Sequence, residues 1–125
     1  MMTNRTDLPL PAAAPTRDFV DIALWRTRDT DILEHYVRNR VSNLSNRDFD
    51  VVSYDVVVAG NFRAHTTAAR VTAHLGSDVV VAVVGDQCGE FVAVQNVFEL
   101  LDSKLTAHRR ALGRPVRTRV VAHDQ

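Results

Sequence analysis

The run Val79-Val80-Val81-Ala82-Val83-Val84, followed within a few residues by the long segment 90–112, decides the fold. Six consecutive apolar residues, mostly β-branched, predict a buried strand. Gly85-Asp86-Gln87-Cys88-Gly89 breaks that pattern. In 90–112 apolar residues recur every three or four positions, which predicts one amphipathic helix. The residues expected on its apolar face are Phe91, Val94, Phe98, Leu101, Leu105 and Leu112. Gly113 is expected to cap this helix, and Pro115 to prevent its continuation.

Three more strands are predicted upstream. Residues 19–25, 51–59 and 66–75 alternate apolar with polar or small residues, which is typical of half-buried strands. Gly76-Ser77-Asp78 is expected to form a tight turn, so the strands on either side of it form a hairpin.

One further helix is predicted between the first two strands, at residues 31–44. Asp29 or Thr30 is expected to cap its start. The buried stripe expected from helical spacing consists of Ile32, Tyr36, Val37, Val41 and Leu44.

The element order is therefore β-α-β-β-β-α, an α+β class fold. A strand-helix-strand start implies a right-handed crossover and a parallel first pair, and the later strands form an antiparallel meander. The economical arrangement is a two-layer sandwich, a four-stranded mixed sheet with both helices on one face. Because residues 79–84 are apolar at every position, that strand is expected to be buried on both faces. Either a Pro/Ala-rich leader at residues 1–16 or a second copy of the chain in a homodimer would then cover the second face of the sheet.

Composition indicates one ordinary globular domain. The chain has 125 residues, of which 46% are hydrophobic and 24% charged. We expect a disordered leader at 1–16, a single domain at 17–112 and a basic flexible tail at 113–125. The single cysteine, Cys88, permits no internal disulfide, which suits a cytoplasmic location. No apolar stretch approaches the roughly 20 residues that span a bilayer, and no signal-peptide pattern is visible.

The charge is unevenly distributed although its sum is zero. Residues 1–102 hold nine Lys/Arg and fourteen Asp/Glu, a net −5, and residues 103–125 hold six Lys/Arg and one Asp/Glu, a net +5. This basic end is expected to meet phosphate.

The closing helix carries a family resemblance. Phe91-Val92-Ala93-Val94, followed by Leu101-Asp102-Ser103-Lys104-Leu105-Thr106-Ala107-His108-Arg109-Arg110-Ala111-Leu112, resembles the ribosome hibernation-promoting factors, the ribosome-associated inhibitor A family. The resemblance covers residues 19–112 and includes the element order. It implies a non-enzymatic protein that binds the small ribosomal subunit and its rRNA, in the channel used by messenger and transfer RNA. Such a protein silences translation in stressed or stationary cells.

Site residues follow from the same resemblance. The positions that match the family's basic helix end are Lys104, His108, Arg109 and Arg110. Arg38 and Arg40 are candidates by their place on the first helix, and Arg114 by its place in the basic tail. The chain departs from the family in having one lysine, in Gln95 and Gly89 where many members have Asp, and in having only thirteen residues after Leu112. We therefore expect a short, diverged form.

The alternative is a protein-interaction or homodimerisation module of the same fold that has lost RNA binding. An enzyme is disfavoured, because no carboxylate pair, nucleophile–base set or phosphate loop is visible. We expect no metal, since the histidines show no metal spacing. We also expect no cofactor, no small-molecule substrate and no membrane partner. Trp25 is expected to pack, and His108 either to border the core or to touch RNA.

Overall fold

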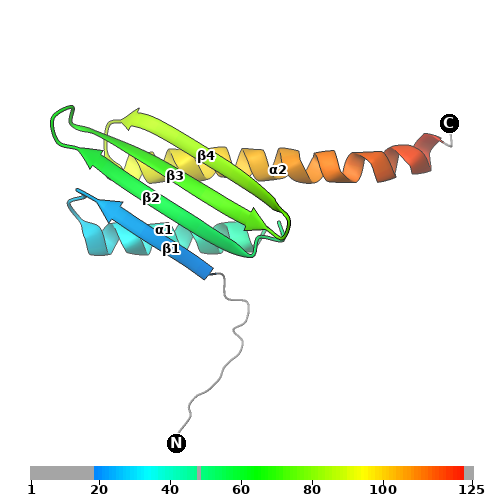
Figure 1. Cartoon of the computed structure of the whole chain (residues 1–125), viewed down its shortest axis with the longest axis horizontal. Coiled ribbons are helices and arrows are strands. Elements are labelled where there is room, and N and C mark those ends of the chain that lie inside the picture. The colour runs from blue at the N-terminus through cyan, green and yellow to red at the C-terminus, as the bar shows by residue number, and fades with distance from the viewer. Residues whose placement is uncertain (1–18, 48, 123–125) are drawn as a thin grey trace, which may run out of the picture.

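The computed structural model describes residues 19–47 and 49–122, and the side chains of these up to Gly113. Its elements are β1 (Phe19–Trp25), α1 (Thr30–Ser45), β2 (Ser53–Asn61), β3 (Thr66–Leu75), β4 (Asp78–Gln87) and α2 (Glu90–Ala122) (Figure 1). The predicted leader at 1–16 lies outside the described residues.

The strands form one mixed sheet in the order β1-β2-β3-β4. β1 and β2 are parallel, with Ile22 opposite Val56, because α1 carries the chain back between them. β2, β3 and β4 are antiparallel neighbours. The predicted topology is therefore confirmed.

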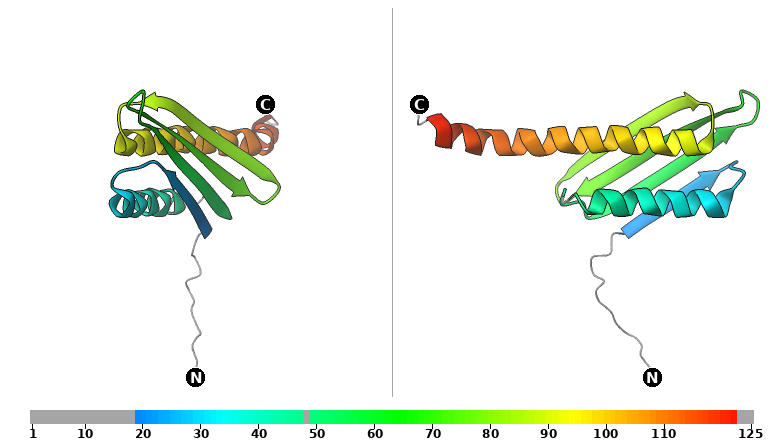
Figure 2. Two further views of the ribbon diagram at one scale, coloured as in Figure 1. Left: turned by 60° about the vertical axis from the view of Figure 1, so that its left-hand side comes forward. Right: turned by 180° about the vertical axis from the view of Figure 1, so that it is seen from behind.

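Both helices cover the same face of the sheet, as predicted (Figure 2). Alternate residues of each strand point into the layer between sheet and helices, where Tyr54 and Phe98 are the largest fully buried side chains. Tyr36 of α1 and Phe91 of α2 join the helices, with ring centroids 5.6 Å apart. The core is thus one continuous cluster between two layers.

One predicted core position of α1 is wrong by one step along the chain. Ile32 is 63% exposed, and its neighbour Leu33 is fully buried, because the stripe of α1 runs through Leu33, Val37, Val41 and Leu44. A helix rotates by about 100° per residue, so the adjacent position faces solvent. The strand predicted at 51–59 is β2 at Ser53–Asn61, so Val52 precedes the strand and is 56% exposed.

β4 is longer than predicted, and its outer face is open. The pairing of β4 with β3 continues to Gln87. The pairing register shifts between Thr67 and Ala69 of β3, and Asp86 adopts a φ of 52°. The residues 85–87 that were expected to end the strand therefore form an irregularity within it. Val79, Val81 and Val83 are 55%, 37% and 56% exposed, so within the described residues β4 is buried on one face only, and the covering of its second face by residues 1–16 or a second copy stays a prediction. The reason is that both helices lie on the other side of the sheet.

α2 also continues where an end was predicted. It passes through Gly113 and Pro115 to Ala122, so residues 113–122 are helical, and residues 123–125 lie outside the described part. Gly113 does not adopt the left-handed conformation that a glycine cap needs, since Gly76 is the one described glycine with positive φ. Leu112 is 62% exposed because α2 has by then run beyond the sheet (Figure 1). None of the described helices is long and apolar enough to cross a membrane.

Candidate nucleic-acid interface

Arginines gather where the end of α1 meets the middle of α2. We call Arg47, Arg109 and Arg110 the basic cluster. Arg47 follows α1 and pairs with Asp102 of α2, Nη1 to Oδ2, at 2.9 Å. Nη1 of Arg109 donates to the backbone oxygen of Arg47 at 3.4 Å. These contacts tie the two helices together and hold the arginines at the surface.

The basic cluster borders a shallow hollow. Its volume is about 400 Å³, and it is lined by Arg47, Phe49, Thr106, Arg109, Arg110 and Gly113. The Arg47 guanidinium carbon lies 5.2 Å from the centroid of the Phe49 ring, a cation–π distance. Asp102 and Glu99 line a neighbouring hollow with Arg47 and Arg110, so acidic groups flank the cluster on one side. The surface offers guanidinium donors that suit phosphate contacts, while the Phe49 ring beneath Arg47 belongs to the buried core.

Two predicted residues of α2 turn to β4 instead of the cluster. Nζ of Lys104 donates to the backbone oxygen of Val81 at 2.8 Å. Nε2 of His108 lies 3.2 Å from Oδ2 of Asp78. The structure thus brings together Arg109 and Arg110, and it places Lys104 and His108 along the edge of the sheet.

The predicted residues of α1 have different surroundings. Arg38 is exposed and pairs with Glu34 one turn away at 3.0 Å. Arg40 is half-buried, and its Nε is buried with no hydrogen-bond partner among the described residues. An unmade hydrogen bond of this kind costs about 1–3 kcal/mol. Arg114 lies in α2, and its side chain is outside the described set.

Sequence reasoning missed Arg47 and Phe49, which follow the predicted end of the first helix. A signal was present in the predicted topology, because β4 runs parallel to β1, so the helices that follow these two strands run in the same direction. The residue after α1 must then lie beside the second half of α2, where the predicted arginines are. Trp25, which was expected to pack, is 62% exposed at the end of β1. Among the described residues, no group of three His, Cys, Asp or Glu could hold a metal ion.

Comparison with known proteins identifies the fold. No family model matches this sequence, and no curated protein matches it. The structure is similar to the N-terminal domain of Protein Y from Thermus thermophilus, with a TM-score of 0.61 and 15% identity over 72% of this chain and 98% of that one. It is also similar to a ribosomal subunit interface protein from Coxiella burnetii, with a TM-score of 0.62 and 7% identity over 73% of this chain and 97% of that one.

At these identities the likeness concerns the fold alone. Both solved structures come from the ribosome hibernation-promoting factor family. The sequence resemblance had predicted this architecture, so that prediction is confirmed: the chain has the α+β fold of the hibernation-promoting factors.

Proposed function

We propose that this chain binds the small ribosomal subunit through rRNA and silences translation under stress or in stationary phase. The observation that carries the proposal is the shared fold, which spans 98% and 97% of two proteins of that family, one of them named as a ribosomal subunit interface protein. The role involves no catalysis and belongs in the cytoplasm, where ribosomes work.

The basic cluster supplies the chemistry for this role. Each guanidinium can give a phosphate two parallel charged hydrogen bonds, which makes arginine well suited to dense rRNA phosphates. The tie from Arg47 to Asp102 keeps one fork oriented before binding, so less side-chain freedom is lost on docking. A surface of this kind reads RNA shape more than sequence.

Two further features extend the proposed surface. α2 continues beyond the cluster with Arg114, Arg117 and Arg119, which bring more positive charge to the protruding half of the helix. On α1, the Nε of Arg40 is buried and lacks an acceptor among the described residues, so the side chain must swing outward to meet a phosphate oxygen. Arg38, Lys104 and His108 remain candidates, each after giving up its present contact.

The test is sucrose-gradient co-sedimentation of the purified chain with separated ribosomal subunits at low and high salt. We expect salt-sensitive migration with the small subunit. The double variant Arg109→Glu/Arg110→Glu should abolish it, and Arg110→Gln alone should lower the log–log salt slope by about 0.7–0.9. A translation assay with a reporter message then checks silencing.

A matched control reverses the same charge elsewhere. Arg63 in the β2–β3 turn and Arg70 on β3 are both exposed, so Arg63→Glu/Arg70→Glu changes the net charge equally and should leave sedimentation intact. If both double variants lose binding alike, general charge is responsible and the basic cluster is not the site. If the wild-type chain stays at the top of the gradient at low salt, apart from both subunits, the proposal is overturned.

A second candidate function is a homodimerisation module that has lost RNA binding. The observation that favours it is the open row of Val79, Val81 and Val83 on the outer face of β4. The proposed occupant is a second copy, which would bury the same row against itself. Light scattering should then give twice the chain mass, and Val81→Lys should halve it. If the chain is a monomer by light scattering and stays a monomer when residues 1–16 are deleted, neither a second copy nor the leader covers this face.

A further inference from the structure

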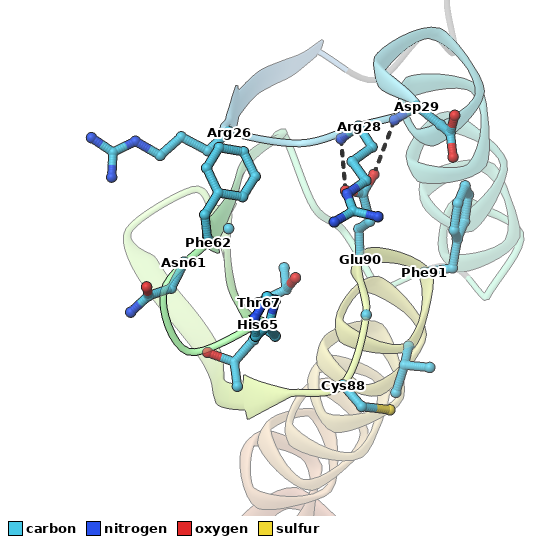
Figure 3. Close-up of a pocket in the computed structure, with 14 residues that line it drawn as sticks. Arg26, Arg28, Asp29, Asn61, Phe62, His65, Thr67, Cys88, Glu90 and Phe91 are labelled. Atoms are coloured by element: carbon cyan, nitrogen blue, oxygen red, sulfur yellow. Dashed lines mark hydrogen bonds between the residues drawn. The ribbon is translucent and has the colours of Figure 1, made fainter.

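A pocket of about 490 Å³ lies at the other end of the helix pair, where α1 and α2 begin (Figure 3). Its walls come from the β1–α1 loop, the β2–β3 turn, the start of β3 and the first turn of α2. The residues that matter for its chemistry are Arg28, Phe62, His65, Thr67, Glu90 and Val92. Its size is in the range of small-ligand pockets.

The acidic group in this pocket is already engaged. The Glu90 carboxylate accepts the backbone N–H groups of Arg28 at 2.8 Å and Asp29 at 3.3 Å. This contact turns the charged carboxylate toward the start of α1 and holds the β1–α1 loop over the start of α2. The carboxylate of Asp29 points away from the centre of the pocket in Figure 3. Both acids line the pocket, and the Glu90 carboxylate is directed at the β1–α1 loop.

The floor presents unused hydrogen-bond donors. The first bond within α2 runs from the N–H of Ala93 to the oxygen of Gly89 at 2.9 Å. The N–H groups of residues 90–92 precede it and have no partner among the described residues. A helix start with free amides favours an anion, because the amides and the helix dipole both present positive charge.

Thr67 is the second and independent sign of a ligand. It is the one buried polar residue among those described, 7% exposed, and it lines the pocket. Its hydroxyl has no hydrogen-bond partner within the described part of the chain. Figure 3 shows Thr67 and His65 on one wall, facing Arg28 and Glu90 across the opening. The one fully buried unpaired side-chain atom among the described residues is Arg40 Nε, so the Thr67 hydroxyl still opens onto the pocket, where it can donate to a ligand.

We propose that this pocket binds a phosphate-bearing ligand of mononucleotide size. The phosphate sits at the amides of residues 90–92, with the hydroxyl of Thr67 donating to it and the guanidinium of Arg28 beside it. The exposed ring of Phe62, 56% accessible at the rim, offers a face on which a base can stack. A free nucleotide and the 5′ end of an RNA strand carry this same chemistry. The site lies at the opposite end of the helices from the basic cluster, so it stands or falls independently of ribosome binding.

The test is a titration of the ¹⁵N-labelled full chain followed by amide NMR. The probes are inorganic phosphate, AMP, adenosine, and a trinucleotide with and without a 5′ phosphate. We expect phosphate and AMP to shift the amides of residues 90–92, AMP to bind more tightly than phosphate, and adenosine to leave those amides unmoved. A response to the phosphorylated trinucleotide but not to AMP assigns the phosphate to an RNA end. If neither phosphate, AMP nor the phosphorylated trinucleotide moves residues 90–92 at millimolar concentration, the proposal is overturned.

Variants locate the site. Thr67→Val should weaken AMP binding about 2- to 10-fold, the range for one lost hydrogen bond, and Arg28→Gln should weaken it by about tenfold. Thr72→Val on the same strand and Arg63→Gln outside the pocket are the matched controls. Because the Thr67 hydroxyl is unpaired, Thr67→Val should leave the thermal midpoint unchanged or raised, which separates a lost ligand contact from a damaged fold. Equal affinity in wild type, Thr67→Val and Arg28→Gln would contradict the assignment.

Discussion

The two ends of the helix pair solve the same electrostatic problem with opposite groups. α1 and α2 run side by side in the same direction (Figures 1 and 2), so their dipoles are parallel and like partial charges meet at each end. At the start, the Glu90 carboxylate bonds two amides of the other helix's entry. At the finish of α1, guanidinium groups take over, with Arg109 donating to the carbonyl of Arg47. At the first end the Glu90 carboxylate has hydrogen-bond donors, and the amides of residues 90–92 have no acceptor among the described residues. At the second end the arginines outnumber the acidic side chains beside them.

The largest effect should come from closing the space at the first end. A Cβ on Gly60 would collide with the backbone oxygen of Arg26, and that oxygen cannot move without displacing the β1–α1 loop. We expect Gly60→Ala to destabilise the fold by about 1–3 kcal/mol, measured by urea denaturation. An unchanged midpoint would show that the loop is free to shift and that the first end is not rigidly built.

Removing the acid at the same end should have the next largest effect. Glu90→Ala leaves the amides of Arg28 and Asp29 without their acceptor. The expected loss is about 0.5–2 kcal/mol, as for a lost helix cap. Glu90→Gln should recover part of it, and Glu99→Ala on the exposed side of α2 should change little. Equal losses for Glu90→Ala and Glu99→Ala would remove the distinction between the two positions.

The same glycine-to-alanine change should have the opposite sign at the second end. Gly113 lies within α2 without positive φ, and an added Cβ meets nothing within 4 Å. We expect Gly113→Ala to stabilise the protein by about 0.5–1 kcal/mol in the same denaturation assay. A loss of stability would instead support the helix end first predicted at Leu112.

The smallest effect should be the ion pair that ties the second end. The Arg47 and Asp102 side chains are 51% and 36% exposed, so solvent screens the pair. A double-mutant cycle with Arg47→Ala and Asp102→Ala should give a coupling of about 0.2–1 kcal/mol that shrinks in high salt. A coupling that does not respond to salt would show a pair stabilised by burial, and the second end would then resemble the first.

Much of the fold could be predicted because the strands read clearly. β1 and β3 were bounded correctly at both ends, since alternation fixes which side chains face inward. The errors lie where local rules meet tertiary context. The bulge near Asp86 let β4 outlast its apolar run, and the core selected Leu33 over Ile32. Pro115 was taken as a stop, although a helix can continue past a proline with the loss of one hydrogen bond.

The candidate sites were less predictable than the fold. Arg109 and Arg110 stand in one basic run and were found by inspection, but Arg47 joins them only through the packing of α1 on α2. The pocket at the first end draws Arg28, Thr67 and Glu90 from three segments whose sequences show no shared motif. An unpaired hydroxyl is also invisible in a sequence, because its neighbours are known only after folding.

Lys104 disfavours the addition of another strand at the β4 edge of the sheet. An edge strand with valines in a row is a template on which another extended chain can add, and β4 is such a strand. The ammonium of Lys104 reaches from α2 to the Val81 carbonyl and places a positive charge at that edge. A strand that approached to pair would have to strip this charge of water or displace it. The lysine thus discourages fibre-like growth along the sheet while leaving the flat outer face of β4 open.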